Sequence, residues 1–478
     1  MYEMIKMEVL EAALDEIKNV VGNSNISFAL HDKYVYSKDA WILSVIKFKR
    51  LEDLPLPDAI VWPENTQQVS EILKIATKYR VPIIPYGGGA GVVGGIIASK
   101  GGIILDLKKM HNVIRIDKNS LVAVVQPGII GQNLEERLNR FGLTLGHYPM
   151  SLTTSTIGGF VATRASGIMS TKYGNIDDMV MALEVVLPTG EIIRTKATPK
   201  ASNGPDLNRI FIGSEGTLGV ITEITLKLHK IPESREFRVY LFEDLNNAIN
   251  AIREILQKDI YPAIVRLYDE YDTFLTLNRI NISAQGNLLF LLLDGDKRIV
   301  ETESKIIDEI CKSHNAKAMD PKIGWHWWEH RYKQYFDLPE VLEGGFADTI
   351  EVATTWDKIN ELYTKVREAL ESNDLMVLAH FSHLYRTGAA IYFTFVGEIA
   401  DGPDPYVNLR NAWDSAMNAI LEVGGTISHH HGVGIARNPW LKDELGSSYL
   451  LLKKLKETLD PSNIMNPGKL GFNGVEWL

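Results

Sequence analysis

Residues 85–95 read PYGGGAGVVGG, and six of the nine residues from Gly87 to Gly95 are glycine. Within this stretch, residues 89–94 match G-x-G-x-x-G, the pattern of the dinucleotide-binding loop in Rossmann folds. That interpretation requires a helix to begin directly after the loop. Only IIASK separates Gly95 from the next glycine pair, and the IILDL that follows is typical of a strand. The stretch therefore predicts a strand, a glycine loop and a second strand, and it argues against a nicotinamide-dinucleotide site.

Consecutive glycines allow several backbone N–H groups to converge on one phosphate, because no side chain stands in the way. A tight structural turn is the alternative, but six glycines are more than a turn needs. We therefore expect this loop to bind the phosphate of a cofactor. The residues assigned to that contact are Pro85, Gly87, Gly88, Gly89, Ala90 and Gly91.

Three later stretches contain the same small residues, hydroxyls and glycines: STIGGFVATRASG (155–167), YGNIDDMV (173–180) and GSEGTLGVIT (213–222). Together with the glycine loop, they resemble the FAD-binding domain of the vanillyl-alcohol oxidase and p-cresol methylhydroxylase superfamily. The resemblance implies that the glycine loop grips the FAD pyrophosphate. It also implies that further residues lie along the cofactor, namely Pro149, Met150, Ser151, Thr156, Gly158, Gly159, Thr163, Glu215, Gly219, Val220 and Ile221. The loop contains neither histidine nor cysteine, so we expect non-covalent FAD.

After residue 230, amphipathic helical patterns such as KRIVETESKIIDEICKS alternate with strand-like runs such as NLLFLLLDG. This alternation predicts an antiparallel sheet covered by helices, placed as a cap over the flavin. The predicted fold class is α+β, with a two-subdomain FAD-binding domain and this cap. The expected divisions are a helical segment at 1–50, the FAD-binding domain at 51–230, the cap at 231–440 and a tail at 441–478 that packs back near the FAD domain.

Three adjacent histidines, His429, His430 and His431, stand between glycines in SHHHGVG. Imidazole exchanges a proton near neutral pH, as chemistry at a hydroxyl or ketone carbon requires. With AIVRLYD and GAAIYFTF, this stretch resembles alkyldihydroxyacetonephosphate synthases and their prokaryotic relatives, over nearly the whole chain. The resemblance implies that Tyr392, the three histidines and Arg266 are catalytic.

Two departures from the synthase pattern stand out. Its His-Glu-Pro-Asp-Ser stretch here reads HYPMS, with Met150 in place of the aspartate, and its second arginine has no clear counterpart in YFDLPEV. A bidentate arginine is the usual way to bind a phosphate dianion. Arg331 is a candidate replacement.

The ending DPSNIMNPGKLGF resembles a neighbouring branch, the D-2-hydroxyacid dehydrogenases. That branch has a divalent-metal site, and His380, His383 and His430 could form one here. The Gly-Asp-Gly-Asn element of that site is missing, so we expect no metal.

The bulk composition limits the partners and the compartment. A net charge of −10 argues against a nucleic-acid partner, no apolar run is long enough to span a membrane, and the single cysteine, Cys311, fits a cytoplasmic protein. At 478 residues, two or three domains are expected. A homodimer is compatible with these features, and the electron acceptor is open.

The functional hypothesis is an FAD-dependent oxidoreductase that oxidises a small hydroxy acid or polyol derivative by hydride transfer to flavin N5. The alternative is synthase chemistry, in which a fatty alcohol replaces an acyl group with no net redox change. A flavin-binding protein without catalysis is a third possibility, disfavoured by the histidines, Tyr392 and Arg266.

Overall fold

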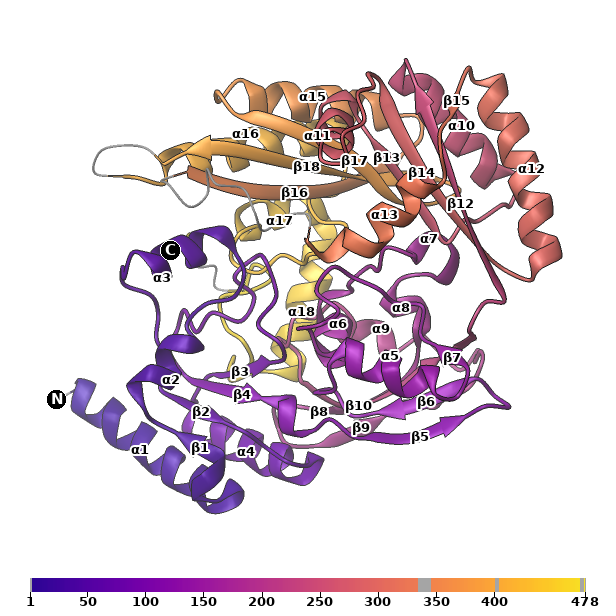
Figure 1. Ribbon diagram of the computed structural model, residues 1–478. Helices are drawn as coiled ribbons and strands as arrows, with labels where there is room; N and C mark the ends of the chain where they lie inside the picture. Colours follow the sequence, from indigo (N-terminus) through magenta and orange to yellow (C-terminus); the bar gives the residue numbers. More distant parts are fainter. Residues whose placement is uncertain (1, 334–344, 400–403, 473–476, 478) are drawn as a thin grey trace.

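The computed structural model describes residues 2–333, 345–399, 404–472 and 477, and it has two main parts (Figure 1). The purple part, residues 2–230, contains a four-stranded sheet, a five-stranded sheet and a two-stranded ribbon, and the pink-to-orange part, from residue 234 on, contains one seven-stranded sheet. The C-terminal helices α17 (Asn438–Leu445) and α18 (Tyr449–Leu459), in yellow, lie between the two parts. The mixed α+β architecture predicted from the sequence is confirmed.

The first sheet places the glycine loop. It has the order β1-β2-β4-β3, with β1 antiparallel to β2 and the other pairs parallel. Its strands are β1 (Ile26–Ser27), β2 (Ala59–Val61), β3 (Ile83–Tyr86) and β4 (Ile103–Asp106). No helix forms between β3 and β4, as the sequence predicts, and yet the two strands are parallel. Residues 87–102 are long enough to make this crossover as a loop, so the glycines lie at the carboxyl end of β3.

The second sheet is antiparallel, with the order β5-β6-β10-β8-β9. Its strands are β5 (Val113–Asp117), β6 (Val122–Val125), β8 (Val180–Val186), β9 (Ile192–Arg194) and β10 (Val220–Lys227); a separate ribbon pairs β7 (Leu143–Thr144) with β11 (His229–Lys230). The helices of this part are α1 (Tyr2–Val21), α2 (Leu30–Val35), α3 (Ile42–Lys49), α4 (Thr66–Tyr79), α5 (Gly131–Asn139), α6 (Ile157–Thr163), α7 (Ser170–Tyr173), α8 (Ile176–Met179) and α9 (Asn208–Phe211).

The cap sheet is antiparallel throughout, with the order β15-β12-β14-β13-β17-β18-β16. Its strands are β12 (Ser234–Phe242), β13 (Ile264–Tyr268), β14 (Asn287–Gly295), β15 (Lys317–Ala318), β16 (Gly345–Thr355), β17 (Met376–Leu384) and β18 (Gly388–Glu398). Its helices are α10 (Leu245–Gln257), α11 (Glu270–Asn278), α12 (Lys297–Ser313), α13 (Lys322–His330), α15 (Ile359–Glu371) and α16 (Val407–Val423).

Both faces of β14 are buried, which explains its continuous apolar run. Side chains alternate between the two faces of a strand. Leu289, Leu291 and Leu293 accordingly join the core beneath α10 and α12, whereas Leu288, Phe290 and Leu292 pack with Ile323 and Trp327 of α13 on the opposite face. In Figure 1, α13 lies between the cap sheet and the purple part. The cap therefore meets the rest of the molecule through an apolar layer.

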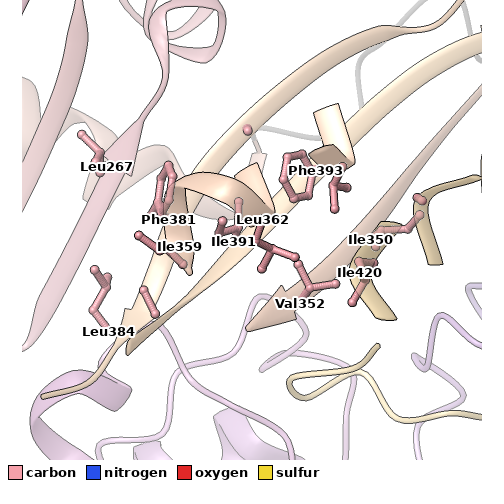
Figure 2. Packing of buried hydrophobic residues seen from close by; sticks show 14 of the residues in the cluster. Leu267, Ile350, Val352, Ile359, Leu362, Phe381, Leu384, Ile391, Phe393 and Ile420 are labelled. Carbon is pink, nitrogen blue, oxygen red and sulfur yellow. The ribbon is translucent and has the colours of Figure 1, made fainter. Parts of the chain in front are cut away.

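The main core lies between the cap sheet and α15 and α16. Figure 2 shows Phe381 of β17 and Phe393 of β18 packed with Leu362 of α15, near Ile420 of α16. Each is fully buried or nearly so, and burying a side chain of this kind contributes about 1.5–3 kcal/mol. This core fixes the strands β17 and β18, which carry several of the candidate site residues.

Candidate active site

The glycine loop is packed closely against the start of α6. A Cβ added at Gly88 would lie 2.1 Å from the carbonyl oxygen of Thr154, and one at Gly87 would lie 2.4 Å from Oγ1 of Thr156. Only glycine allows this approach. The contact brings together the first two stretches that the sequence assigned to the cofactor.

The loop also has free hydrogen-bond donors. Among the residues that the structure describes, no protein acceptor is found for the backbone N–H groups of residues 87–91. Residues 87–90 are half-buried and Gly91 is exposed, and a group of converging unpaired backbone donors fits an anionic ligand. The residues present therefore fit the pyrophosphate of a dinucleotide cofactor such as FAD.

The other predicted cofactor residues have varied positions. Thr156 is the N-cap of α6 and accepts from the N–H of Gly159 at 3.2 Å, while Gly158 approaches Pro127. The side chains of Val220 and Ile221 are buried in hydrophobic cores, which leaves only their backbone to meet a ligand. The remaining members lie on turns or at element ends: Pro149, Met150 and Ser151 in a turn, Thr163 at the end of α6 with its hydroxyl donating to the Gly159 carbonyl, and Gly219 just before β10 against the Val186 carbonyl.

Glu215 contacts the segment 428–434, which contains the three adjacent histidines and is called the histidine turn below. The sequence did not predict this contact. The Glu215 carboxylate accepts from the N–H of Val433 at 2.6 Å and of Gly434 at 2.8 Å. The carbonyl of Val93 accepts from Ile435 and Ala436 directly after this turn. The C-terminal tail adds Asn466, whose amide donates to the carbonyls of Gly95 and Glu215. The histidine turn is thus fixed directly beside the glycine loop.

Tyr392 of β18 lies at the centre of the histidine cluster. Its hydroxyl oxygen is 2.6 Å from Nε2 of His430 and 3.4 Å from Nε2 of His383. His380, which faces Tyr392 across the β17–β18 pair, stacks on the tyrosine ring at 4.7 Å between centroids. Nδ1 of His383 contacts the Ser170 hydroxyl at 2.7 Å. The Tyr392 side chain therefore meets residues of β17 and of the histidine segment directly, and α7 is joined to it through His383.

A bulge in β17 makes this arrangement possible. The β17–β18 register shifts between Ser382 and Leu384, and His383 has a φ of 53°. This left-handed conformation is uncommon for a residue other than glycine. In a regular strand, residues three apart point to opposite faces. The bulge instead places the His383 ring on the same side as His380, where both rings meet Tyr392.

Arg266 of β13 lies beyond His380. Its Nη2 is 2.9 Å from Nε2 of His380, and its Nε donates to the hydroxyl of Tyr268 at 2.8 Å. Because arginine only donates, Nε2 of His380 is the acceptor and Nδ1 carries the hydrogen. That nitrogen lies 3.3 Å from the carboxylate of Asp272. The guanidinium also lies over the ring of Trp327, at 5.5 Å from its centroid, so its plane is well fixed.

Burial disfavours the charged form of the histidines in this cluster. Burial lowers the pKa of His430, His383 and His380 well below the ordinary value, and it lowers the pKa of His431 to about 4. The pKa of His429 is lowered as well, again chiefly by burial. Each ring therefore keeps an unprotonated nitrogen that can accept a hydrogen bond, while burial disfavours a charged imidazolium.

The histidine turn folds around a buried carboxylate that the sequence analysis missed. Glu351 of β16 accepts the backbone N–H groups of His429, His430 and His431, and it pairs with the buried Arg437 at 2.9 Å. Burial alone would raise the pKa of Glu351, but the charge of Arg437 and these contacts lower it to about 2. The sequence did contain a sign of this buried carboxylate, because Glu351 is an acidic residue within the apolar strand pattern FADTIEVAT.

We predict that Glu351→Gln loosens this turn. The amide loses the negative charge that balances Arg437, and breaking a buried ion pair costs about 3–5 kcal/mol. The thermal melting temperature of the FAD-loaded protein should fall by several degrees. Glu422→Gln is the control, because that carboxylate is exposed and pairs with Lys365 at the surface. Equal melting of the Glu351 variant and the wild type would contradict this account.

The histidines do not form a metal site in the part of the chain that the structure describes, where no group of three or more potential ligands is placed to hold a metal ion. His380 uses both ring nitrogens with Arg266 and Asp272, while Nε2 of His383 and of His430 both face Tyr392.

Within the residues that the structure describes, no helix is both long and apolar enough to cross a bilayer.

The sequence departs from the synthase pattern at Met150 of HYPMS and at the missing arginine of YFDLPEV, and the structure describes only the first of these stretches. YFDLPEV lies outside the described residues. Arg331 stacks on Trp328 at 3.6 Å from the ring centroid and on Tyr332 at 4.3 Å, and Trp328 contacts Tyr148 of the HYPMS stretch. Arg331 thus lies near Tyr148 of that stretch, and these contacts do not define a phosphate site.

Comparison with known proteins identifies the class. Residues 57–196 match the FAD binding domain family, and residues 231–470 match the family of FAD linked oxidases, C-terminal domain. The fold and the glycine loop therefore belong to a flavoprotein that uses FAD. The chain is a member of the FAD-linked oxidase family and is an enzyme of that family.

Its relatives cover both chemistries considered above. The chain is 31% identical to an alkyldihydroxyacetonephosphate synthase of Trypanosoma brucei brucei, covering 97% of this chain and 81% of the relative. It is 32% identical to the uncharacterized FAD-linked oxidoreductase YgcU of Escherichia coli K12, covering 96% and 98%. It is 31% identical to the glycolate oxidase subunit GlcD of Bacillus subtilis, covering 95% and 96%.

Solved structures show the same fold. An alkyldihydroxyacetonephosphate synthase superposes with a TM-score of 0.81 at 26% identity, over 96% of this chain and 86% of the other. A p-cresol methylhydroxylase with bound substrate superposes with a TM-score of 0.80 at 17% identity, over 97% of each chain. The predicted superfamily is confirmed.

Proposed function

We propose that this enzyme oxidises a small hydroxy acid or polyol derivative and passes the electrons to FAD. The observation that carries the proposal is the Tyr392 hydroxyl, 2.6 Å from the buried His430, with the Arg266 guanidinium 2.9 Å from Nε2 of the stacked His380 ring. A base beside a fixed cation suits a substrate that has a hydroxyl next to an anionic group. The similarity to a glycolate oxidase subunit supports the same choice.

Each group has a role in this proposal. Tyr392 accepts the hydroxyl proton while its own proton passes to Nε2 of His430, and the lowered pKa of His430 leaves that ring without an extra proton beforehand. Arg266 binds the anionic end of the substrate, and His380 holds the guanidinium in place. When bound, FAD supplies the acceptor for the two electrons and the hydrogen that leave the substrate carbon.

FAD is held non-covalently in this proposal. The glycine loop has no histidine or cysteine, and Cys311 is fully buried in α12 of the cap. Burial also raises the pKa of its thiol, so it is a poor nucleophile.

The test is anaerobic mixing of the FAD-loaded protein with candidate 2-hydroxy acids and polyol phosphates. The correct substrate should bleach the flavin absorbance near neutral pH. The matched control for each hydroxy acid is the acid that lacks the hydroxyl, such as propionate for lactate. It should leave the flavin oxidised, because no hydroxyl proton can reach Tyr392.

Synthase chemistry is the second candidate, and the similarity to a synthase over 97% of the chain favours it. It exchanges an acyl group for a fatty alcohol without net redox change. If no hydroxy acid or polyol bleaches the flavin, and a long-chain alcohol is transferred to an acylated dihydroxyacetone phosphate, the oxidoreductase proposal is wrong.

A further inference from the structure

A continuous series of hydrogen-bonding contacts leads away from Tyr392. After the contact with Nε2 of His430, Nδ1 of His430 lies 2.9 Å from Nδ1 of His429. Nε2 of His429 then lies 2.7 Å from the hydroxyl of Tyr385, which also accepts from the amide of Asn175 at 2.9 Å. Four side chains thus join end to end through both nitrogens of each imidazole.

The Nδ1–Nδ1 contact restricts where the hydrogens are. Both rings are neutral, since burial lowers both pKa values, so each carries one ring hydrogen. At 2.9 Å, one Nδ1 must donate and the other must accept. If His430 has its hydrogen on Nδ1, its Nε2 is free to accept from Tyr392, and His429 has its hydrogen on Nε2 and donates to Tyr385. If one ring changes tautomer, the other must change too.

The series runs from the interior towards the surface. His430 is buried, His429 and Tyr385 are half-buried, and the next residues in the chain, Arg386 and Thr387, are exposed. The other contact of Tyr392 leads inward, because His383 is buried and its Nδ1 meets the buried Ser170. Of these two routes, the one through His429 ends at the half-buried Tyr385, which adjoins the exposed Arg386 and Thr387 in the chain.

We propose that this series, which we call the tyrosine–histidine relay (Tyr392, His430, His429 and Tyr385), carries the substrate's hydroxyl proton out of the active site. The inference rests on the proposed function and adds Tyr385 and His429 to it. The substrate hydroxyl gives its proton to the Tyr392 oxygen as the Tyr392 proton moves to Nε2 of His430. The Nδ1 proton of His430 moves to Nδ1 of His429, and the Nε2 proton of His429 moves to Tyr385.

Tyr385 then releases its own hydroxyl proton to water, so one proton enters the relay and one leaves. Both tyrosines end as they began, and the two histidines exchange tautomers without either becoming charged. This avoids an imidazolium in a buried site, which would be costly. Tyr385 is therefore a positioning and relay residue that never touches the substrate.

The kinetic test is Tyr385→Phe in the FAD-loaded protein. Flavin reduction by the hydroxy acid that best bleaches the wild type is followed in H₂O and D₂O. We expect the rate to fall roughly tenfold to hundredfold with a larger solvent isotope effect, because the relay has lost its outlet. Tyr363→Phe removes a comparably buried hydroxyl that contacts Asp269, outside the relay, and should change neither quantity. An unchanged rate and isotope effect in Tyr385→Phe would overturn the proposal.

A second measurement needs no substrate. Nitrogen-15 NMR of histidine-labelled protein reports which ring nitrogen carries hydrogen, and His429→Gln and His430→Gln variants assign the signals. We expect opposite tautomers for His429 and His430, and a changed His429 signal in Tyr385→Phe. Identical tautomers, or a protonated ring near neutral pH, would overturn the relay. If no hydroxy acid reduces the flavin while the tautomers are opposite, the proposed reaction fails and the hydrogen-bond pattern remains supported.

Discussion

Replacing Tyr392 with phenylalanine should slow flavin reduction by roughly 10² or more and leave FAD bound, since general acid–base catalysis commonly contributes that much. The phenylalanine ring can keep the stacking on His380, at 4.7 Å between centroids. What is lost is the oxygen 2.6 Å from His430, and with it the route for the hydroxyl proton. Stopped-flow anaerobic reduction measures the rate, and the flavin-to-protein absorbance ratio measures FAD content.

Tyr449→Phe is a suitable control for this experiment. Its hydroxyl donates to the Gly471 carbonyl in the C-terminal segment, away from the histidines, so its removal should not affect the rate. If Tyr392→Phe reduces FAD as fast as the wild type, Tyr392 has no part in proton transfer. If that variant is colourless, the tyrosine supports the site architecture instead, which would also contradict the prediction.

Gly88→Ala should yield a protein that retains little or no FAD. Its Cβ would lie 2.1 Å from the Thr154 carbonyl oxygen and 2.9 Å from Cα of Ser155, so the loop must move away from the start of α6. Moving it redirects the unpaired N–H groups that fit the pyrophosphate. Overpacking of this kind costs about 1–3 kcal/mol, and the FAD dissociation constant should rise by up to roughly a hundredfold. Titration of the apoprotein with FAD measures the change.

Gly95→Ala is the matched control, seven residues along the chain. Its Cβ would meet only Oε2 of Glu215, at 3.8 Å, an ordinary van der Waals distance, and Gly95 has no positive φ. This variant should bind FAD like the wild type. Equal FAD affinity in Gly88→Ala would mean that the loop does not bind the cofactor through its closely packed backbone.

Local sequence patterns predicted most of the architecture. The glycine run and its short downstream segment predicted a strand, a glycine loop and a second strand, without a Rossmann helix. Alternating helical and strand patterns after residue 230 predicted the antiparallel cap, and the structure has both. These predictions succeed because the spacing of apolar residues and glycines along the chain is a local signal of helices, strands and loops. The candidate residues Tyr392, Arg266 and His430 were also identified from the sequence, by resemblance.

The interactions that organise the site could not be predicted in this way. Glu215 reaches the histidine turn across more than two hundred residues, and Glu351 holds the three histidine amides from another strand. In the sequence, nothing distinguishes Tyr385 from other tyrosines at the end of a strand. Its contact with His429 is made only in the folded chain.

The sequence alone thus predicted the glycine loop between two strands, the use of FAD and the helix-covered antiparallel sheet, because those depend on residue type and spacing. The tertiary structure decided which nitrogen faces which oxygen around Tyr392. That depends on the register of β17 against β18, on the bulge at His383 and on Glu351, which fixes the histidine turn. Hydrogen bonds act over about 3 Å, so only the folded chain can specify them.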